Sequence, residues 1–238
     1  MLDGTVALVT GASSGIGAAA AGALAAQGAA VALAARRRDR LETLAAGIRE
    51  RGGTALVLEC DITDEQQAAG AVARTVAGLG RLDTLVNNAG VMLLGPAAGA
   101  PLPEWQQMVE LNVLGLLYCA LAALPHLLRA AGDSPRQVAD MVNISSVAGR
   151  AARNGNGVYS LSRHGVGAFS ESLRQEVTGR YVRVCLAGAG RDRDGAGRPQ
   201  PARGARQHTK PVRADDAGRG HRRRDQLRRY PAAARRGE

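Results

Sequence analysis

The segment from Thr10 to Gly17 has the residue types that could bind a phosphate. It reads Thr-Gly-Ala-Ser-Ser-Gly-Ile-Gly and joins an apolar run to an Ala-rich segment. Glycines let a backbone turn tightly and approach a pyrophosphate, and the N-terminus of a following helix offers free N–H groups. Because the turn follows a predicted strand and opens a predicted helix, it predicts dinucleotide binding rather than a purely structural turn. The candidate ligands are Gly11, Ser13, Ser14, Gly15, Ile16 and Gly17.

Three arginines follow the second predicted strand, where an acidic residue would bind the adenosine ribose of NAD. The chain reads Ala35-Arg36-Arg37-Arg38, and Asp39 lies too far along to replace that acid. Arginine can form charged, forked hydrogen bonds with a phosphate. The sequence therefore predicts NADP(H) in preference to NAD(H), with Arg36 or Arg37 as the ligand of the 2′-phosphate. The alternative is a solvated helix start.

Short apolar runs alternate with helical patterns over the first 187 residues. The predicted strands are 6–10, 31–35, 55–59, 84–87, 139–144 and 182–186. The predicted helical segments are 15–27, 38–51, 64–79, 103–129 and 157–178. Asp64 is a candidate N-cap of the third of these helices. Strands separated by helices of this length predict right-handed crossovers and a doubly wound, parallel α/β sheet of the Rossmann type.

The basic charge of the chain comes from its C-terminal end. The formal net charge is +10, but residues 1–187 hold 16 Arg and 15 Asp or Glu. Residues 188–238 hold 15 Lys or Arg, 6 Asp or Glu, and few larger apolar side chains. Such a segment cannot offset its ordering entropy by burial. We therefore expect a dinucleotide-binding domain over 1–187 and a disordered Arg/Gly/Ala-rich tail over 188–238.

The remaining composition favours a cytoplasmic protein without a metal site. Cys60, Cys119 and Cys185 have no metal-ligand spacing, so we expect buried thiols in a reducing compartment. The N-terminus lacks a basic stretch before an apolar one, which argues against a signal peptide. Residues 111–128 are strongly apolar, but Asn112, Pro125 and His126 interrupt them. We interpret this segment as a buried helix and expect no membrane association.

Several motifs at predicted strand ends together resemble the short-chain dehydrogenase/reductase family over residues 3–187. The first turn has the family's T-G-x-x-x-G-x-G spacing, an Asn-Asn-Ala-Gly motif begins at Asn87, and Ser146 lies thirteen residues before Tyr159. Because their order and spacing agree with the family together, chance does not explain the resemblance. The resemblance implies that residues after the third and fourth strands contact the cofactor, namely Asp61, Ile62, Asn88, Ala89 and Gly90.

The resemblance also implies a catalytic group, which departs from the family at one position. Tyr159 would be the general acid, Ser146 would polarise the substrate carbonyl, and Asn112 would anchor a water of the proton relay. The family has lysine four residues after the tyrosine, whereas this chain has Arg163. Tyr159 and Arg163 share a helix face, so a cation still lies beside the phenol. Because arginine is bulkier and planar, we expect weakened rather than abolished catalysis, with Arg163 still able to bind the nicotinamide ribose.

The resemblance predicts an oxidoreductase that transfers a hydride between NADP(H) and a small carbonyl or alcohol substrate. Segments 92–96, 124–129 and 168–177 are most similar to the subgroup that contains clavulanate dehydrogenase, which reduces carbonyls with NADPH. The family also implies a homo-oligomer whose contacts use two long helices and the last strand. A chain without that strand would lose part of the interface. The alternative is a catalytically impaired relative that only binds the cofactor.

Residues 188–238 do not match the family, which continues with a Pro-Gly turn, a segment covering the substrate and a last strand. Back-translation with a shift of one base recovers family-like segments, so we interpret this tail as the product of a reading-frame shift near codon 187. A chain made as written would keep an exposed sheet edge. The competing interpretation is a basic tail that binds nucleic acid or an anionic surface. The tail lacks stacking aromatic residues beyond Tyr230, which disfavours nucleic acid.

Overall fold

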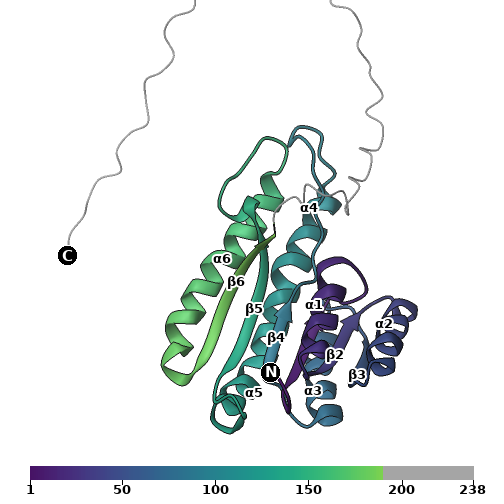
Figure 1. The fold of residues 1–238 in the computed structure, drawn as a ribbon. Coiled ribbons are helices and arrows are strands. Elements are labelled where there is room, and N and C mark those ends of the chain that lie inside the picture. Colours follow the sequence, from purple (N-terminus) through teal and green to yellow (C-terminus); the bar gives the residue numbers. More distant parts are fainter. Residues whose placement is uncertain (190–238) are drawn as a thin grey trace, which may run out of the picture. The chain divides into compact units, whose positions relative to one another are not determined.

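The computed structural model describes residues 1–189, which form a parallel sheet with helices on both faces (Figure 1). The strands are β1 (Val6–Thr10), β2 (Ala30–Ala35), β3 (Ala55–Glu59), β4 (Thr84–Asn87), β5 (Ala139–Ser146) and β6 (Val182–Ala189). The helices are α1 (Gly15–Ala26), α2 (Arg38–Glu50), α3 (Glu65–Leu79), α4 (Leu102–Val109), α5 (Gly115–Asp133) and α6 (Gly157–Val177). The described residues also form three short turns, the π-helical η1 (Glu110–Leu114) and the 3₁₀ turns η2 (Val147–Gly149) and η3 (Thr178–Arg180). The interpretations made for the tail, residues 188–238, lie outside the described residues except at Gly188 and Ala189, which pair with β5 as the end of β6 and so are not part of a disordered segment.

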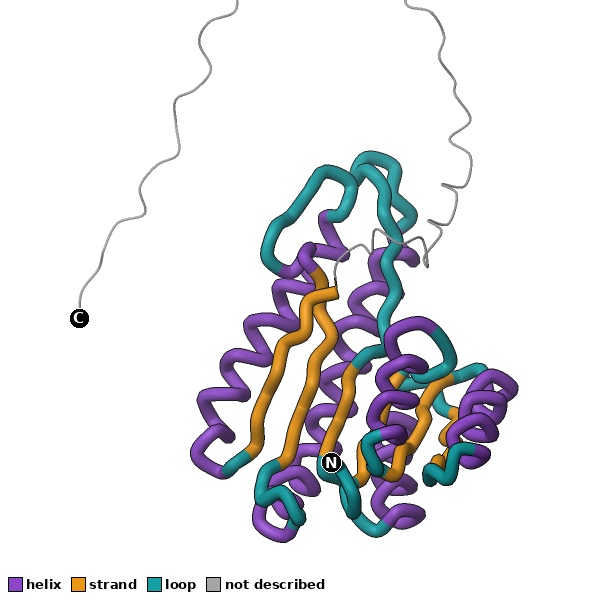
Figure 2. The backbone as a smooth tube through the Cα atoms, in the orientation of Figure 1, coloured by secondary structure: helices purple, strands orange, loops and turns teal. Residues whose placement is uncertain are grey.

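The strand order confirms the predicted doubly wound fold. The order is β3-β2-β1-β4-β5-β6, and every neighbouring pair is parallel. Figure 2 shows the strands side by side in orange. The chain winds outward from β1 to β3, then returns to the centre and winds the other way from β4 to β6. The order therefore reverses between β1 and β4. Open α/β sheets bind ligands at the carboxyl ends of the strands beside such a reversal.

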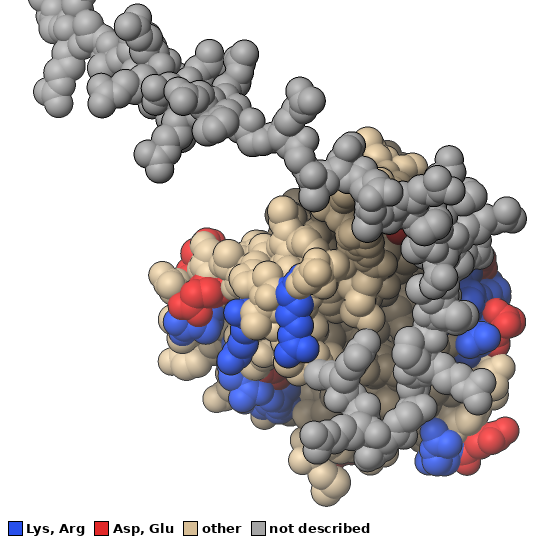
Figure 3. Space-filling view, turned by 90° about the horizontal axis from the view of Figure 1, so that it is seen from above, with Lys and Arg blue, Asp and Glu red and all other residues tan. Residues whose placement is uncertain are grey.

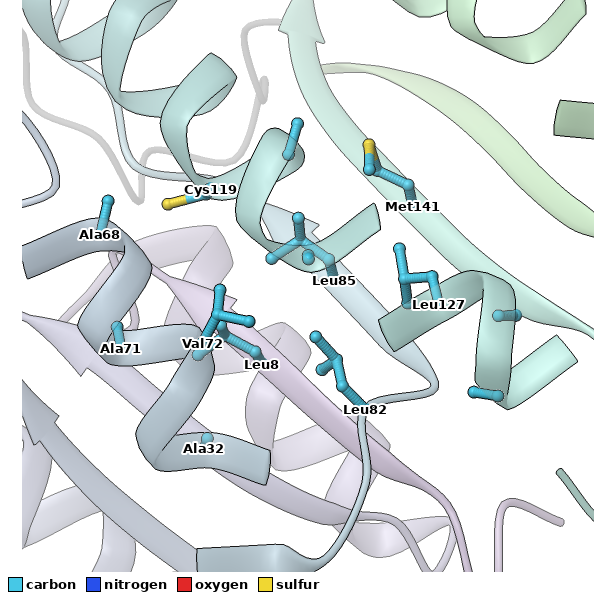
Figure 4. Close-up of a cluster of buried hydrophobic side chains, with 14 of the residues drawn as sticks. Leu8, Ala32, Ala68, Ala71, Val72, Leu82, Leu85, Cys119, Leu127 and Met141 are labelled. Carbon is cyan, nitrogen blue, oxygen red and sulfur yellow. The ribbon is translucent and has the colours of Figure 1, made fainter. Parts of the chain in front are cut away.

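Two apolar cores hold the helices against the sheet. One core packs α1 and α2 on the sheet face that carries Val9 and Leu33. The other packs α3, α5 and part of α6 on the opposite face, around Leu8, Leu85 and Met141 (Figure 4). Alternate strand residues supply the two faces, so both faces of the central strands are buried, as a parallel sheet requires. Many of the helix residues in these cores are alanines, which lets the helices lie close to the strands.

The predicted elements agree with the structure, with differences at their ends. Asp64 caps α3 as predicted, because its carboxylate accepts a hydrogen bond of 2.9 Å from the N–H of Gln67. The strands β5 and β6 each run further than predicted, and their last residues, Ser146 and Ala189, are paired in register. Each extension depends on the neighbouring strand, which hydropathy periodicity does not report.

The apolar segment around α5 is a core helix in the described part of the chain. By length and composition, the helical run Leu102–Asp133 could cross a membrane. Its buried face packs on the second core, and the residues that α5 buries are Gly115, Leu116, Cys119, Ala120, Ala123, Leu127, Ala130 and Ala131. Small residues recur along this face, which suits close packing on α3 and the sheet.

The expectation of three buried thiols is wrong for one cysteine. Cys60 and Cys119 are buried, and burial raises the pKa of both thiols, that of Cys119 to about 12. Neither thiol is therefore a ready nucleophile at neutral pH. Cys185 is exposed because β6 is the edge strand of the described sheet, and no described helix covers that side of it.

A buried carboxylate ties β5 to β6 at the amino end of the sheet. Asp140 accepts hydrogen bonds from Arg183 at 2.6 Å and from Arg136 at 2.8 Å. Burial alone would raise the pKa of Asp140, but the hydrogen bonds and charges of the two arginines outweigh it, so the pKa lies below its ordinary value of 3.8. A lowered folded-state pKa stabilises the fold above the ordinary value, and this stabilisation is lost as the pH falls through the folded-state pKa.

We predict that Asp140→Asn lowers the free energy of unfolding by about 1–3 kcal/mol at pH 7, because two arginines lose their charged partner. The deficit should shrink as the pH falls below 3.8, because the unfolded wild-type chain binds a proton there and the folded protein binds it only at a lower pH. Urea unfolding at pH 7 and at several acidic pH values measures it, with the exposed Asp133→Asn as a control that should change stability by less than about 0.5 kcal/mol. A deficit that stays constant down to pH 3 would contradict the assignment.

Candidate active site

Two loops meet at the carboxyl ends of β1 and β4, where the strand order reverses. The Asn88 side chain donates hydrogen bonds to the main-chain oxygens of Thr10 at 2.9 Å and Gly11 at 3.3 Å. The Thr10 hydroxyl in turn accepts from the N–H groups of Asn88 and Ala89 at 3.0 and 3.2 Å. A Cβ on Gly17 would lie 2.4 Å from the Asn88 amide nitrogen, so only glycine allows this approach. The glycine-rich turn is thereby held against the Asn-Asn-Ala-Gly motif.

The start of α1 is suited to an anionic ligand. Its N-cap residue, Ser14, makes no side-chain cap hydrogen bond, and the first turn holds no acidic residue. The N–H groups of that turn are therefore not capped by side chains, and the positive end of the helix dipole is not neutralised. Gly15 has φ +58°, and a Cβ there would meet open space. These features fit a pyrophosphate bound at the helix N-terminus.

Two of the three arginines after β2 reach toward this end of the sheet. Arg37 donates hydrogen bonds of 2.8 Å to the hydroxyls of both Ser13 and Ser14. Arg36 forms an ion pair of 3.7 Å with Asp61, at the end of β3. Both arginines have several N–H donors left after these contacts. Figure 3 views the molecule from the carboxyl ends of the strands and shows exposed arginine side chains on this side.

A cavity of about 400 Å³ runs along the carboxyl ends of the strands and collects most of the predicted cofactor residues. All of them line it except Gly15 and Gly17, which belong to the first turn of α1. The predicted lining residues are Gly11, Ser13, Ser14, Ile16, Arg36, Arg37, Asp61, Ile62, Asn88, Ala89, Gly90, Tyr159 and Arg163. Residues from loops far apart in the sequence therefore surround one space.

The cavity also has walls that sequence reasoning did not identify. These are Ala34, Ala35, Cys60, Leu111, Ile144, Ser145 and Ala189. Most lie at or directly after the ends of strands β2, β3, β5 and β6. Their side chains carry no distinctive motif, but their position at carboxyl ends is itself a signal that could have found them.

Tyr159 and Arg163 lie side by side on α6 at one end of this cavity. Their exposed fractions are only 8% and 7%, and the Arg163 guanidinium carbon lies 5.3 Å from the centre of the Tyr159 ring. Arg163 Nη1 donates a hydrogen bond of 3.0 Å to the main-chain oxygen of Ile144, while Nε is buried without a partner among residues 1–189. The predicted helix-face pairing of phenol and cation is thus present.

The guanidinium also reaches the loop after β4. A Cβ on Gly90 would lie 2.4 Å from Arg163 Nη2, so the glycine leaves the space that the longer side chain occupies. No carboxylate of the described residues lies within 4.0 Å of Arg163. The site therefore keeps a positive charge next to the phenol that no carboxylate of residues 1–189 neutralises.

The two serines that end β5 have different surroundings. Ser146 is partly exposed, and its hydroxyl accepts a hydrogen bond of 3.2 Å from the N–H of Ala148 in η2. A hydroxyl used as an acceptor in this way keeps its own proton to donate to another oxygen. Ser145 is buried, lines the cavity and donates to the main-chain oxygen of Arg163 at 3.3 Å. Ser146 and Asn112 are not among the lining residues of the cavity.

Asn112 lies in the π-helical turn η1 and is fully buried. Its side chain accepts a hydrogen bond of 2.8 Å from the Val91 N–H and donates to the Val91 oxygen at 2.9 Å and to Ser162 at 3.2 Å. The amide is therefore used to hold the chain after Gly90 against α6. A water held by Asn112 would have to bind at its main chain.

Comparisons with known proteins agree with this geometry. The sequence pattern of the family described as short chain dehydrogenase matches residues 5–191. A glycine betaine reductase of Emericella nidulans is 40% identical over 183 residues, which are 77% of this chain but only 14% of that protein. A serine 3-dehydrogenase of Rhizobium radiobacter is 37% identical over 184 residues, 77% of this chain and 70% of the relative.

A solved structure supports the same assignment. The crystal structure of a short-chain type dehydrogenase/reductase from Mycobacterium marinum superposes with a TM-score of 0.73 at 31% identity. The likeness covers 79% of this chain and 74% of that one. The family pattern extends over the glycine-rich turn, the Asn-Asn-Ala-Gly motif and α6. The chain therefore belongs to the short-chain dehydrogenase/reductase family.

Proposed function

We propose that the protein is an NADP(H)-dependent oxidoreductase that interconverts a small alcohol and the corresponding carbonyl compound. The observation that carries this proposal is the position of Tyr159 beside the Arg163 cation, in the same cavity as the glycine-rich turn and Arg37. This arrangement puts a proton donor and a dinucleotide site in one space. A hydride transfer coupled to a proton transfer needs both.

The side chains at the far end of the cavity support NADP(H) rather than NAD(H). Arg37 lies on the two loop serines, and Arg36 is paired with Asp61, so two cations stand where the adenosine ribose would bind. No acidic residue ends β2. A 2′-phosphate would gain charged hydrogen bonds here, whereas a ribose 2′-hydroxyl would lack its usual carboxylate partner.

The residues near Tyr159 have separate tasks in the proposed reaction. The bound nicotinamide supplies the hydride in the reductive direction and accepts it in the oxidative one. Tyr159 donates its proton to the substrate oxygen during reduction, and the adjacent Arg163 cation stabilises the phenolate that remains. Ser146 donates a hydrogen bond to the same substrate oxygen. Asn112 holds Val91, and with it the loop after β4.

The substrate is proposed only as a chemical class. The relatives described above are named a serine 3-dehydrogenase and a glycine betaine reductase, and both names give a small, polar compound. The three segments that resemble the clavulanate dehydrogenase subgroup favour carbonyl reduction. We therefore infer a small, polar carbonyl or alcohol compound.

Turnover of nicotinamide cofactor with a panel of small carbonyl and alcohol compounds, followed at about 340 nm, is the direct test. Removing the phenol in Tyr159→Phe should lower kcat by about 10²- to 10⁴-fold, the usual contribution of a general acid. The Kd of NADPH should change by less than about twofold, since the ring is retained. Equal activity of the variant and the wild type would contradict the role of Tyr159.

The cofactor preference should depend on Arg37. Arg37→Ala is expected to raise the Kd of NADPH by about 10- to 100-fold, the value of a hydrogen bond to a charged group, and to leave the Kd of NADH unchanged. Arg40→Ala removes an equally exposed arginine of α2 that does not line the cavity, and should change neither value. Fluorescence titration with NADPH and with NADH measures the Kd of each cofactor for the wild type and for both variants. Equal losses for NADPH and NADH would argue against a 2′-phosphate ligand.

A second candidate function is cofactor binding with little catalysis, and Arg163 is the observation that favours it. Its guanidinium is fixed on the Ile144 oxygen and leaves Nε without a described partner. A lysine would place a single compact charge with three rotatable donors at this point of the helix. The proposed oxidoreductase and the relative that only binds the cofactor therefore differ in whether Arg163 supports proton transfer by Tyr159.

We predict that Arg163→Lys raises kcat by about tenfold, because an ammonium group can follow the ribose and the phenolate as the reaction proceeds. The comparison is made per cofactor-binding site, so that differences in folding do not enter. Arg153→Lys, an exposed change in the loop before α6, serves as the matched control and should leave kcat unaltered. No gain in a variant that folds and binds NADPH would mean that arginine is fully competent.

A further inference from the structure

A row of buried polar side chains connects β4, β5 and α6. The Asn87 amide donates to the Asn143 side-chain oxygen at 2.9 Å, and the Asn143 amide donates to the Ser170 hydroxyl at 2.9 Å. Ser170 donates onward to the main-chain oxygen of Val166 at 2.7 Å. The exposed fractions of the three polar residues are 3%, 0% and 4%. None of them lines the cavity.

The location of this row is informative because apolar contacts could have filled the same space. A buried polar group costs free energy unless it is hydrogen-bonded, and Asn87 Oδ1 has no partner in the described chain. The row therefore contributes less stability than apolar packing could. Its hydrogen bonds have fixed directions, which apolar contacts lack, so they define the position of α6 on the sheet.

Ser170 and Arg163 are two separate anchors of α6 on β5. Arg163 contacts the strand through Nη1 to the Ile144 oxygen, and Ser145 donates to the Arg163 oxygen. Ser170 lies seven residues later, which is about two helical turns or 10 Å along the axis and returns to the same helix face. Apolar packing also holds α6 on the sheet, and the two polar contacts add fixed directions that define its rotation and its shift along β5.

The row also reaches the loop that carries the cofactor residues. Asn87 is the last residue of β4, directly before Asn88, which is bonded to Thr10 and Gly11. The same set of hydrogen bonds therefore holds both the helix that carries Tyr159 and Arg163 and the loop that carries Asn88. Figure 1 shows α6 running along β5 and β6, so a shift of the helix would move both active-site residues together.

We infer that Ser170, Asn143 and Asn87 are positioning residues, which set where the Tyr159–Arg163 pair stands relative to the bound nicotinamide. The inference rests on the proposed function, because it assigns these residues to the same site. The phenol and the cation share one helix, so the distance between them does not depend on the row. What depends on the row is their placement against the loop after β4 and against Ser146.

The test compares Ser170→Ala, Ser170→Thr and Ser134→Ala in the full chain. Ser134 is a matched control, since it is also 4% exposed, follows α5, and its hydroxyl accepts from the Arg136 N–H at 3.3 Å rather than from a residue of the row. Three quantities are measured: the Kd of NADPH, the Kd of 2′,5′-ADP, which lacks the nicotinamide and its ribose, and kcat per NADPH-binding site.

Ser170→Ala should weaken NADPH binding about tenfold and lower kcat about tenfold or more, because a displacement of about 1 Å at a reacting centre costs up to a hundredfold. Binding of 2′,5′-ADP should be unchanged, because the adenosine end does not contact α6. The pH midpoint of kcat should also be unchanged, because phenol and cation move together. Ser170→Thr retains the hydroxyl and should restore both values to within about twofold, a change of less than 0.5 kcal/mol.

Equal behaviour of Ser170→Ala and Ser134→Ala, with lower melting temperatures but unaltered kcat per site and unaltered Kd ratio, would overturn the inference. A wild-type protein that binds NADPH without turning over any substrate would refute the proposed reaction. In that case the ratio of the NADPH and 2′,5′-ADP affinities still decides whether the row positions the site. Absence of NADPH binding in the wild type would refute the proposed function and the inference with it.

Discussion

The close approach of two loops at the centre of the sheet is the contact on which the rest of the site depends. Thr10 and Asn88 exchange main-chain and side-chain hydrogen bonds across the point where the strand order reverses. The absence of a side chain at Gly17 permits this distance. Because of it, the uncapped start of α1 and the loop after β4 face the same cavity. Without it, the glycine-rich turn would remain a phosphate site without a neighbouring reactive centre.

The second constraint is the orientation of α6. The helix carries Tyr159, the proposed proton donor, and the Arg163 cation, and polar contacts at Arg163 and Ser170 fix it on β5. The exchange of the family's lysine for Arg163 alters this constraint as well as the chemistry. A lysine would bring one compact charge with three rotatable donors, whereas the guanidinium holds the Ile144 oxygen through Nη1 and presents its other donors in a fixed plane. The positive charge of Arg163 is therefore fixed in position, whereas the charge of a lysine could move.

Stability and chemistry lie at opposite ends of the same strands. At the amino ends, Asp140 is neutralised by two arginines, and its charge serves the pairing of β5 with β6. At the carboxyl ends, Arg163 and Arg37 meet hydroxyls and main-chain oxygens rather than carboxylates. Arg136 and Arg183 therefore use donors on Asp140, whereas Arg163 and Arg37 have N–H donors left for a ligand. This separation is what a parallel sheet permits, since all its strands end at one edge.

The amino-acid sequence by itself determined the fold class, the strand positions and most residues of the cavity. Strand-helix alternation and the glycine-rich turn are local patterns, so the turn at Gly11 and the cap at Asp64 could be predicted from neighbours in the chain. Motif spacing on one helix likewise predicted that Tyr159 and Arg163 lie side by side. These features depend on backbone geometry within a few residues.

Only the tertiary structure decided the contacts between segments far apart in the sequence. Cavity walls such as Ala34 and Ala189 carry no motif, and the exposure of Cys185 follows from its place on an edge strand. The row from Asn87 through Asn143 to Ser170 joins three elements whose spacing in the sequence is arbitrary. Such contacts arise from the register of parallel strands and the packing of helices on them, and a one-dimensional pattern contains neither.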